Sequence, residues 1–336
     1  MSVQAPSAVV MVRPHHFTPN LATLDDNAFQ VGAAGADATE IAAAAFEEVT
    51  RAASALEAAG ITVHLFEDEA SDRPDSVFPN NWISTHSGGH IAVYPMYTPN
   101  RRSERRGDIV ETLKAMYRVQ DVIDYSGLEY DDVFLEGTGA MVLDHEGRIA
   151  YAARSNRADP VALERFCTNF GYEPMVFDAV DASGVPVYHT NVLMCVGSEF
   201  ALAGLDLIVS PSRREEVASR LAARGRREVV PLSAAQVSEF CGNAIELDGR
   251  DGRVVALSGR AFDALLPQQL AVIERTATVL PLDVPTIELA GGSVRCMLAG
   301  VHLDPRAMLA DQPTHEVTSA EEPAQAPGYL RSGSPT

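Results

Sequence analysis

Short apolar segments recur along the chain about every fifty residues, and a small or amide residue precedes each of them. The intervals between the starts of successive segments are 58, 52, 52 and 50 residues. A period of this length, with some drift in the connecting loops, indicates a repeat architecture. The five segments start at Asn81, Gly139, Asn191, Asn243 and Ser293.

The second unit gives the clearest order of elements within a repeat. Two apolar runs, 140–143 and 149–153, flank a short polar turn and predict a β-hairpin. Pro160 at a first helical position and Gly171 at the end then bound a predicted helix, and a strand is expected over 174–177. The same order is predicted for the next two units: strands 192–196 and 200–203 with a helix from Pro211, then strands 244–247 and 254–257 with a helix from about Arg260 that breaks at Pro267.

The two ends of the chain complete one another in this pattern. An amphipathic helix is predicted between the capping residue Asp37 and Gly60, and a strand is expected over 61–66. The last predicted strands, around Ile287 and over 293–298, need the first unit to complete them, so we expect the ends to meet. The predicted fold is therefore α/β, a five-bladed α/β propeller of hairpin–helix–strand units around a pseudo-five-fold axis. A doubly wound parallel sheet is the alternative, but hairpins in nearly every unit argue against it.

Composition and charge limit the partners of such a chain. With 46% hydrophobic residues among 336, the chain can form a large core, and we expect one domain over 1–310. Residues 311–336 are poor in apolar side chains and predict a disordered tail. The net charge of −20 argues against nucleic acid and membrane partners. No apolar run is long enough to cross a membrane and no signal peptide is evident, so a cytoplasmic protein of undetermined oligomeric state is expected.

In a ring of this kind the strand starts converge on the axis, so the residues beside the five markers share one cavity. A nucleophile, a base and a carboxylate in one pocket are typical of covalent catalysis, and neither a metal nor an organic cofactor is expected. The four cysteines show no CxxC pairing, which predicts neither a zinc site nor disulfides. The expected cavity residues are Asp75, Asn80, Asn81, Glu136, His189, Asn191, Asn243 and Cys296.

Cys296 is the candidate nucleophile. Two glycines precede it, at 291 and 292, and the neighbouring Arg295 could favour a thiolate. The alternative is that it is a buried core cysteine, as Cys195 is expected to be within its apolar run.

The basic run 101–106 has two interpretations. Such a run in an acidic protein is ordinarily a solvated helix start, but it can also supply an arginine that binds a small carboxylate. Arg154, at the end of a predicted strand, could be a second arginine of that kind.

Four motifs carry a family resemblance. Pro74–Phe78, Leu135–Gly137, His189–Asn191 and Gly291–Met297 occur in the order found in dimethylarginine dimethylaminohydrolases and arginine deiminases. The residues Arg13-Pro14, Phe17, Asn20 and 27–30 resemble the citrulline utilization hydrolases, or citrulline ureidases, still more closely. The chain is thus similar to the guanidino-group-modifying (pentein) superfamily from about Val9 to Leu303.

The resemblance implies a role for each matched residue. Cys296 matches the nucleophile, His189 the general acid and base, and Glu136 the carboxylate that orients the histidine. Asp75 matches a substrate-holding aspartate, and Arg101 and Arg154 match the arginines that bind the α-carboxylate of an amino-acid substrate. The family works without metal or organic cofactor.

Two departures from the family pattern bear on the substrate. Asn80-Asn81 stands where the methylarginine hydrolases have an acidic pair, and Asn191 stands where deiminases have an aspartate. A guanidinium cation needs carboxylates, whereas a neutral ureido group can pair with amides. The expected function is therefore cleavage of citrulline to ornithine, carbon dioxide and ammonia through an S-carbamoyl enzyme. The alternatives are guanidine hydrolysis, amidinotransfer, and an inactive propeller that serves as a binding module.

Overall fold

The predicted repeats appear as sheets with one internal order. The computed structural model describes residues 3–24, 27, 29–30, 37–181 and 183–306, and these form five three-stranded sheets. In each sheet the middle strand pairs antiparallel with one neighbour and parallel with the other. Four sheets are continuous in sequence: β3 (Ile83–His86), β4 (His90–Val93) and β5 (Asp121–Asp124); β6 (Met141–Asp144), β7 (Ile149–Ala153) and β8 (Glu173–Phe177); β9 (Met194–Val196), β10 (Phe200–Ala203) and β11 (Glu228–Pro231); β12 (Ile245–Gly249), β13 (Gly252–Ser258) and β14 (Thr278–Leu282).

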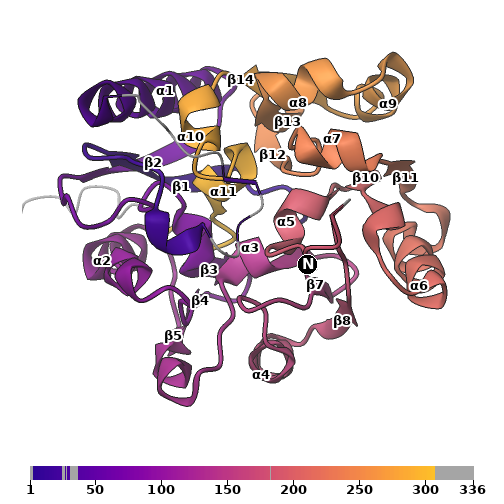
Figure 1. The fold of residues 1–336 in the computed structure, drawn as a ribbon, viewed down its shortest axis with the longest axis horizontal. Coiled ribbons are helices and arrows are strands. Elements are labelled where there is room, and N and C mark those ends of the chain that lie inside the picture. The colour runs from indigo at the N-terminus through magenta and orange to yellow at the C-terminus, as the bar shows by residue number, and fades with distance from the viewer. Residues whose placement is uncertain (1–2, 25–26, 28, 31–36, 182, 307–336) are drawn as a thin grey trace, which may run out of the picture. The chain divides into compact units, whose positions relative to one another are not determined.

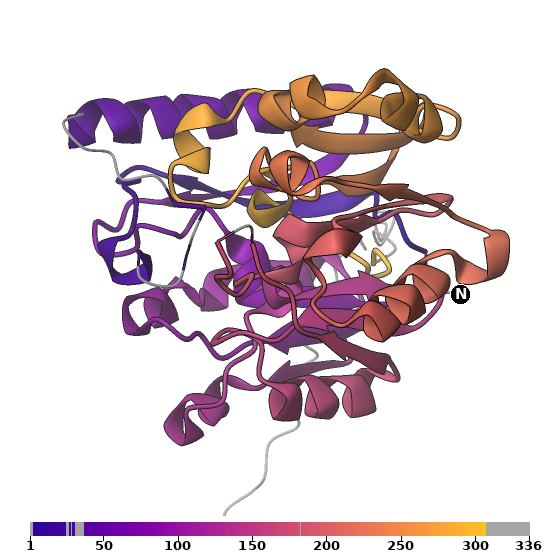
Figure 2. The same cartoon turned by 45° about the vertical axis from the view of Figure 1, so that its right-hand side comes forward.

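The fifth sheet joins the two ends of the chain. Its strands are β1 (Ala8–Pro14), β2 (Thr62–Asp68) and β15 (Ala299–Gly300), and Val9 pairs with Gly300 across the antiparallel ladder. Outside this sheet, α1 (Ala38–Ala58) packs against α10 (Pro285–Glu288), so the indigo and orange-yellow segments lie together in Figures 1 and 2. The prediction that the ends meet is confirmed.

Helices connect the second strand of each unit to the third. In Figure 1 they lie at the periphery, where one apolar face covers the sheets. The predicted boundaries hold well: Asp37 caps α1 by accepting the Thr39 N–H, Asp159 caps α4, and Gly171 ends α4 in the left-handed conformation. Besides α1, these helices are α2 (Gly107–Met116), α4 (Pro160–Phe170), α6 (Pro211–Leu221), α8 (Gly259–Ala264) and α9 (Pro267–Ile273).

The structure corrects the starts of several predicted strands. The apolar run 192–196 begins as a helical turn, α5 (Thr190–Leu193), before β9, and the run 293–298 forms α11 (Val294–Met297). The predicted strand around Ile287 is the helix α10. A short continuous apolar run has no periodicity that separates strand from buried helix, which explains these errors.

The predicted α/β class is confirmed, and no sheet within the described residues closes on itself. Residues Met1–Pro305 form one compact unit. The predicted tail, 311–336, lies outside the described residues. Among the described helices, none combines the length and hydropathy that crossing a membrane requires.

Candidate active site

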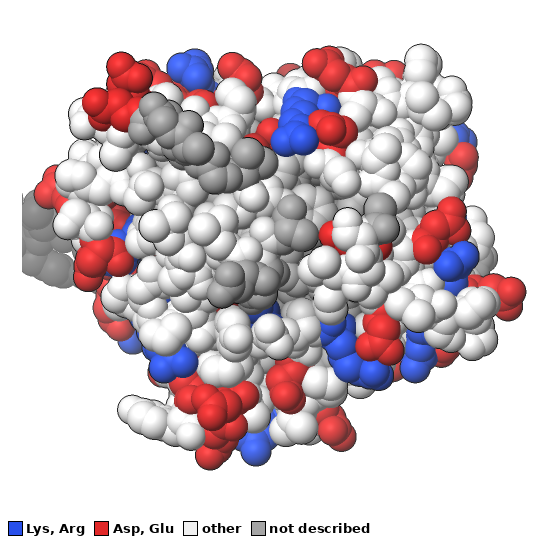
Figure 3. Space-filling model, in the orientation of Figure 1, with Lys and Arg blue, Asp and Glu red and all other residues white. Residues whose placement is uncertain are grey.

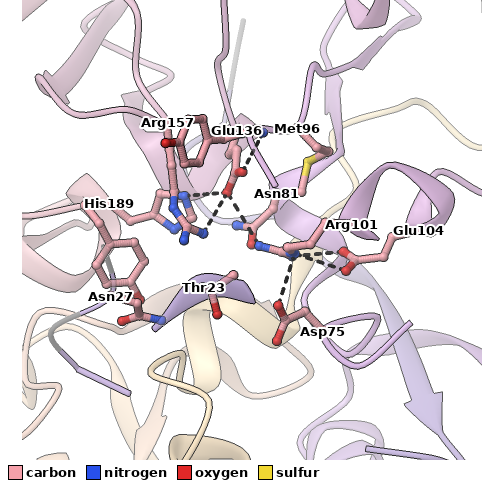
Figure 4. Close-up of polar contacts among 12 residues, drawn as sticks. Thr23, Asn27, Asp75, Asn81, Met96, Arg101, Glu104, Glu136, Arg157 and His189 are labelled. Carbon is pink, nitrogen blue, oxygen red and sulfur yellow. Dashed lines mark hydrogen bonds and ion pairs between the residues drawn. The ribbon is translucent and has the colours of Figure 1, made fainter. Parts of the chain in front are cut away.

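Short helical turns gather the predicted site residues near the centre of the molecule (Figures 1 and 4). Asn81 ends η2 (Pro79–Asn81), Glu136 precedes α3 (Gly137–Ala140), His189 precedes α5, and Cys296 lies in α11. The turns pack directly on one another, and all four side chains are buried. The corrected strand starts are therefore the parts of the fold that build the site.

Close packing of these turns depends on a glycine. A Cβ atom added to Gly139 would lie 2.3 Å from the Asn81 amide nitrogen and 2.9 Å from the His189 ring. Both distances are shorter than van der Waals contact, so a larger residue would push Asn81 and His189 apart. The marker glycine of the second repeat thus serves the site as well as the fold.

Two amide groups hold the sulfur of Cys296. The Nδ2 atoms of Asn191 and Asn243 donate to Sγ over 3.2 and 3.3 Å. Asn243 also accepts the backbone N–H of Arg295 through Oδ1 at 3.0 Å, which fixes the turn that carries the cysteine. Hydrogen bonds from neutral donors to sulfur strengthen when the sulfur carries negative charge, so both amides are placed to stabilise charge that develops on it.

His189 and Glu136 form a buried hydrogen-bonded pair. His189 Nε2 lies 2.9 Å from Glu136 Oε2, which is also 3.4 Å from Arg157 and 3.5 Å from Arg101 (Figure 4). Burial alone would raise the pKa of Glu136, but Arg157, His189 and Arg101 outweigh burial and lower it. Burial lowers the pKa of His189, and Glu136 opposes this only in part. The lowered pKa favours the neutral imidazole, which can accept a proton.

Arg101 lies within a set of carboxylates. It donates two hydrogen bonds to Glu104, at 3.0 and 2.9 Å, and its nitrogens lie 3.4 Å from Asp75 and 3.5 Å from Glu136. Burial would lower the pKa of Arg101, but the charges of Glu104, Asp75 and Glu136 raise it. Burial raises the pKa of Glu104 to about 7, against the attraction of Arg101. Asp75 is held further by the Asn20 amide at 2.8 Å.

The pocket at Cys296 is closed in this structure. Its free volume is about 10 Å³, room for about one water molecule. On the face shown in Figure 3, charged side chains gather towards the rim. The ionic groups of the site are buried. The pocket is lined by Thr23, Asn27, Asp75, Phe78, Asn81, Arg101, Arg157, Tyr188, His189, Ala290, Gly292 and Cys296.

The structure brings most predicted site residues together, but not Arg154. Its side chain is 51% exposed, forms an ion pair with Asp178 at 3.0 Å, and lines a separate open pocket of about 420 Å³. Arg101, in turn, directs its N–H groups at protein carboxylates, which does not support the prediction that it binds a substrate carboxylate. Asn80 is buried beside Asn81 and accepts its amide N–H at 3.0 Å.

Sequence reasoning missed Arg157 and assigned no role to Asn243. Arg157 lies three residues after Arg154, and the family motif alone does not tell which of two nearby arginines turns inward. Asn243 was placed in the cavity by its repeat position, and the bond to Cys296 gives it a function there. No cluster of His, Cys, Asp or Glu within the described residues could hold a metal ion.

The family model described as "N,N dimethylarginine dimethylhydrolase, eukaryotic" matches residues 13–303. No curated protein matches the chain by sequence.

Among solved structures, the N-terminal domain of ArgZ, an arginine dihydrolase from cyanobacteria, resembles the chain with a TM-score of 0.69 at 15% identity, covering 88% of this chain and 98% of that domain. AgrE gives 0.68 at 16% identity, covering 89% of this chain and 40% of AgrE. The enzyme DDAH from Pseudomonas aeruginosa gives 0.58 at 13% identity, covering 88% and 99%. At such identities the similarity shows the fold alone.

Proposed function

We propose that the chain, which belongs to the eukaryotic N,N dimethylarginine dimethylhydrolase family, is a cysteine-dependent hydrolase. Its proposed reaction is cleavage of the ureido group of citrulline. The family and the structural neighbours are members of the pentein superfamily, so the resemblance found in the four motifs is confirmed at that level. The observation that carries the proposal is the contact of two neutral amides with the sulfur of Cys296.

In the first step the Cys296 thiolate attacks the ureido carbon. The bond from this carbon to the side-chain nitrogen of the substrate breaks, and the leaving amine takes a proton from His189. For this step His189 must first be protonated, and Glu136, at 2.9 Å, stabilises the imidazolium. The products of the step are ornithine and an S-carbamoyl enzyme.

In the second step water attacks the carbon of the S-carbamoyl group. His189, now neutral, takes a proton from the water, and the carbon–sulfur bond breaks to regenerate the thiolate. Carbamate leaves and decays to carbon dioxide and ammonia. The pocket of about 10 Å³ admits about one water molecule in its closed state, which suits a hydrolytic step.

The amides around the sulfur support a ureido rather than a guanidinium substrate. Asn191 donates to Cys296 through Nδ2, and its Oδ1 has no hydrogen-bond partner among the described residues. A ureido group offers N–H donors and one acceptor oxygen, so it can pair with such an amide. The carboxylates nearby are already matched by arginines: Glu136 contacts Arg157 and Arg101.

The remaining substrate contacts are proposed from the family motifs. Asp75 lines the pocket and is proposed to hold the substrate near the reacting carbon. Arg154 is proposed to bind the α-carboxylate, because its open pocket and the closed one share Tyr188. Arg101 is proposed instead to position Asp75 and Glu136, since it contacts both.

A guanidine substrate is the second candidate. The eukaryotic N,N dimethylarginine dimethylhydrolase family is named for a methylated arginine, and ArgZ is an arginine dihydrolase. Asp75 supports this alternative, because a carboxylate at the pocket wall can pair with a guanidinium. Amidinotransfer and an inactive binding module have no comparable observation in their favour.

A substrate screen tests the proposal. Purified protein is incubated with citrulline, arginine and methylated arginines, and ornithine, citrulline and ammonia are quantified. The proposal requires citrulline to give one ammonia per ornithine with a higher kcat/KM than arginine. Preference for arginine in the wild type, with either citrulline or ornithine as product, would reject it.

Two variants sharpen the screen. Asn81→Asp and Asn191→Asp add a carboxylate at the pocket, so at least one of them should move the preference towards arginine. An unmatched hydrogen-bonding group in a buried site costs about 1–3 kcal/mol, which corresponds to roughly five- to a hundredfold. Asn169→Asp is the control, because Asn169 lines a pocket in a peripheral unit and its amide binds Tyr125.

Three further expectations from the sequence remain proposals: the propeller arrangement, the extent of the domain and the location in the cell. The five sheets are proposed to be the blades of a propeller whose axis passes through the site, which contacts between β15 and β3, β6 and β9, and β9 and β12 support. Residues 1–310 are proposed to be one catalytic domain. A cytoplasmic location is proposed from the sequence alone.

A further inference from the structure

The consecutive residues Arg295 and Cys296 line two different pockets. Cys296 lines the closed pocket of the proposed active site, and Arg295 lines a second pocket that shares no residue with the first. The turn of α11, in the middle of Figure 1, therefore separates the two spaces. The second pocket also contains His145, His302 and Thr85.

Arg295 differs from the other inward-facing arginines in its partners. Arg227 pairs with Asp144 and Arg101 with Glu104, and in both cases the carboxylates raise the arginine pKa. The guanidinium of Arg295 donates one hydrogen bond, to the Leu298 carbonyl at 2.9 Å, and within the described residues it forms no ion pair. Burial accordingly lowers the pKa of Arg295. A desolvated cation without a counter-ion is costly.

The other groups that line this pocket are suited to an anion. His145 and His302 stack with ring centroids 4.0 Å apart, and His145 Nδ1 lies 2.8 Å from the Tyr172 hydroxyl, which leaves its Nε2 available. The one carboxylate of the pocket, Glu246, accepts both the backbone N–H and the hydroxyl of Ser198 through Oε2. Its other oxygen is buried without a hydrogen-bond partner among the described residues, and Arg295 is the arginine that lines the pocket.

The size of the pocket limits the ligand. Its free volume is about 50 Å³, and a single water needs about 10–15 Å³ on this measure. The space therefore holds about four waters or one small ion. Phosphate esters, amino acids and peptides are too large for it.

We propose that this pocket is a binding site for a small monovalent inorganic anion, of the size of nitrate, bicarbonate or a halide, held by Arg295. An anion there offsets the positive charge that Arg295 places beside the Cys296 sulfur. An anion on Arg295 and negative charge that develops on the Cys296 sulfur thus oppose each other, and the coupling is reciprocal. The anion slows any reaction of Cys296, whichever substrate the enzyme takes.

Crystals of the full-length protein soaked in bromide test the site directly. The proposal expects an anomalous peak within contact distance of the Arg295 guanidinium. Bromide peaks on the surface with water alone in this pocket would overturn it. The experiment needs no turnover, so it is independent of the proposed function.

Alkylation kinetics test the coupling. Iodoacetamide labelling of Cys296, located by peptide mass to separate it from Cys195, is followed with increasing nitrate. Gluconate, which is too large for the pocket, keeps the ionic strength constant. We expect saturable slowing by about fivefold or more, the lower range of typical couplings. Arg295→Gln should abolish the slowing, whereas Arg275→Gln, at an exposed ion pair, should keep it. Equal slowing in all three proteins, or none in the wild type, would contradict the coupling.

Discussion

Cys296 and Cys195 are both buried, yet their surroundings differ in kind. Cys296, at 2% exposure, accepts two amide N–H groups and lines the pocket of His189. Cys195, at 3% exposure, lies in β9 within the largest apolar cluster, and burial raises its pKa to about 12. Equal burial thus accompanies two different surroundings. The donors within reach of the sulfur, and not its exposure, distinguish the proposed nucleophile from a core cysteine.

The same contrast holds for whole regions. The five sheet units are stabilised by apolar contacts between sheets and outer helices, which tolerate a change of one side chain at a limited cost in stability. The centre is made of paired charges and amides that position one another, so a change there alters chemistry before it alters the fold. Each prediction below exploits this difference.

The largest effect is expected from removing the two sulfurs in turn. Cys296→Ala should abolish turnover and leave the melting temperature nearly unchanged, because the cavity it creates is small. Cys195→Ala should keep turnover and destabilise the protein by about 1 kcal/mol through a cavity in the core. Product assays and thermal unfolding of both variants check this. Loss of activity in Cys195→Ala at full stability would reverse the assignment.

Glu136→Gln should have the next largest effect. The variant keeps the shape of the side chain but removes the charge that stabilises protonated His189, and it leaves Arg101 and Arg157 with a neutral neighbour. We expect kcat to fall by about 10²–10⁴, the usual contribution of acid–base catalysis.

The pH profile identifies the cause of that loss. In the wild type the second step needs neutral His189, and the loss of this form at low pH gives an acidic limb. This limb lies below the ordinary histidine value, because burial lowers the pKa of His189. Without the charge of Glu136, which raises the pKa of His189, this acidic limb should move to still lower pH. If the acidic limb does not move in Glu136→Gln, a group other than His189 is responsible for it.

The sequence predicted the strands and helices of the repeated units well because their signals are local. Proline at the first turn, glycine at the last and two apolar runs around a turn are enough to bound α4, β6 and β7, and the structure has them within one or two residues. These features act through backbone geometry within a few residues, so no knowledge of the partner segments is needed.

The centre was less predictable because its partners lie far apart in sequence. Cys296 meets Asn191 across 105 residues, and His189 meets Glu136 across 53. The repeat register placed these residues in one cavity, but it could not tell that Arg101 faces protein carboxylates or that Arg157, and not Arg154, turns inward. Which of two neighbouring arginines turns inward depends on the packing of the turns, and no local pattern encodes it.

A smaller effect is expected from the amides that hold the sulfur. Asn243→Ala removes one donor to Cys296 and the support of the Arg295 backbone N–H. A hydrogen bond to a charged group contributes about 1.5–3 kcal/mol, so alkylation of Cys296 by iodoacetamide at pH 7 should slow by about tenfold or more. Asn169→Ala, whose amide binds Tyr125 in a peripheral unit, is the control. Unchanged alkylation in Asn243→Ala would show that this amide has only a structural role.

The smallest effect concerns stability and pH at Glu104. Its pKa is raised to about 7 in the folded protein, mainly by burial, against 4.5 for an ordinary glutamate. A carboxyl group with a raised folded pKa contributes stability that is fully present below its unfolded value and is lost as pH rises through the folded value. The free energy of unfolding should therefore fall between pH 4.5 and about 7, and Glu104→Gln, which cannot ionise, should lack most of this fall. Urea unfolding at several pH values measures it. Glu111→Gln, at an exposed helix position, is the matched control and should keep the wild-type slope. If Glu104→Gln also keeps that slope, the carboxyl is ionised throughout, and the ion pair with Arg101 outweighs burial at the centre of the molecule.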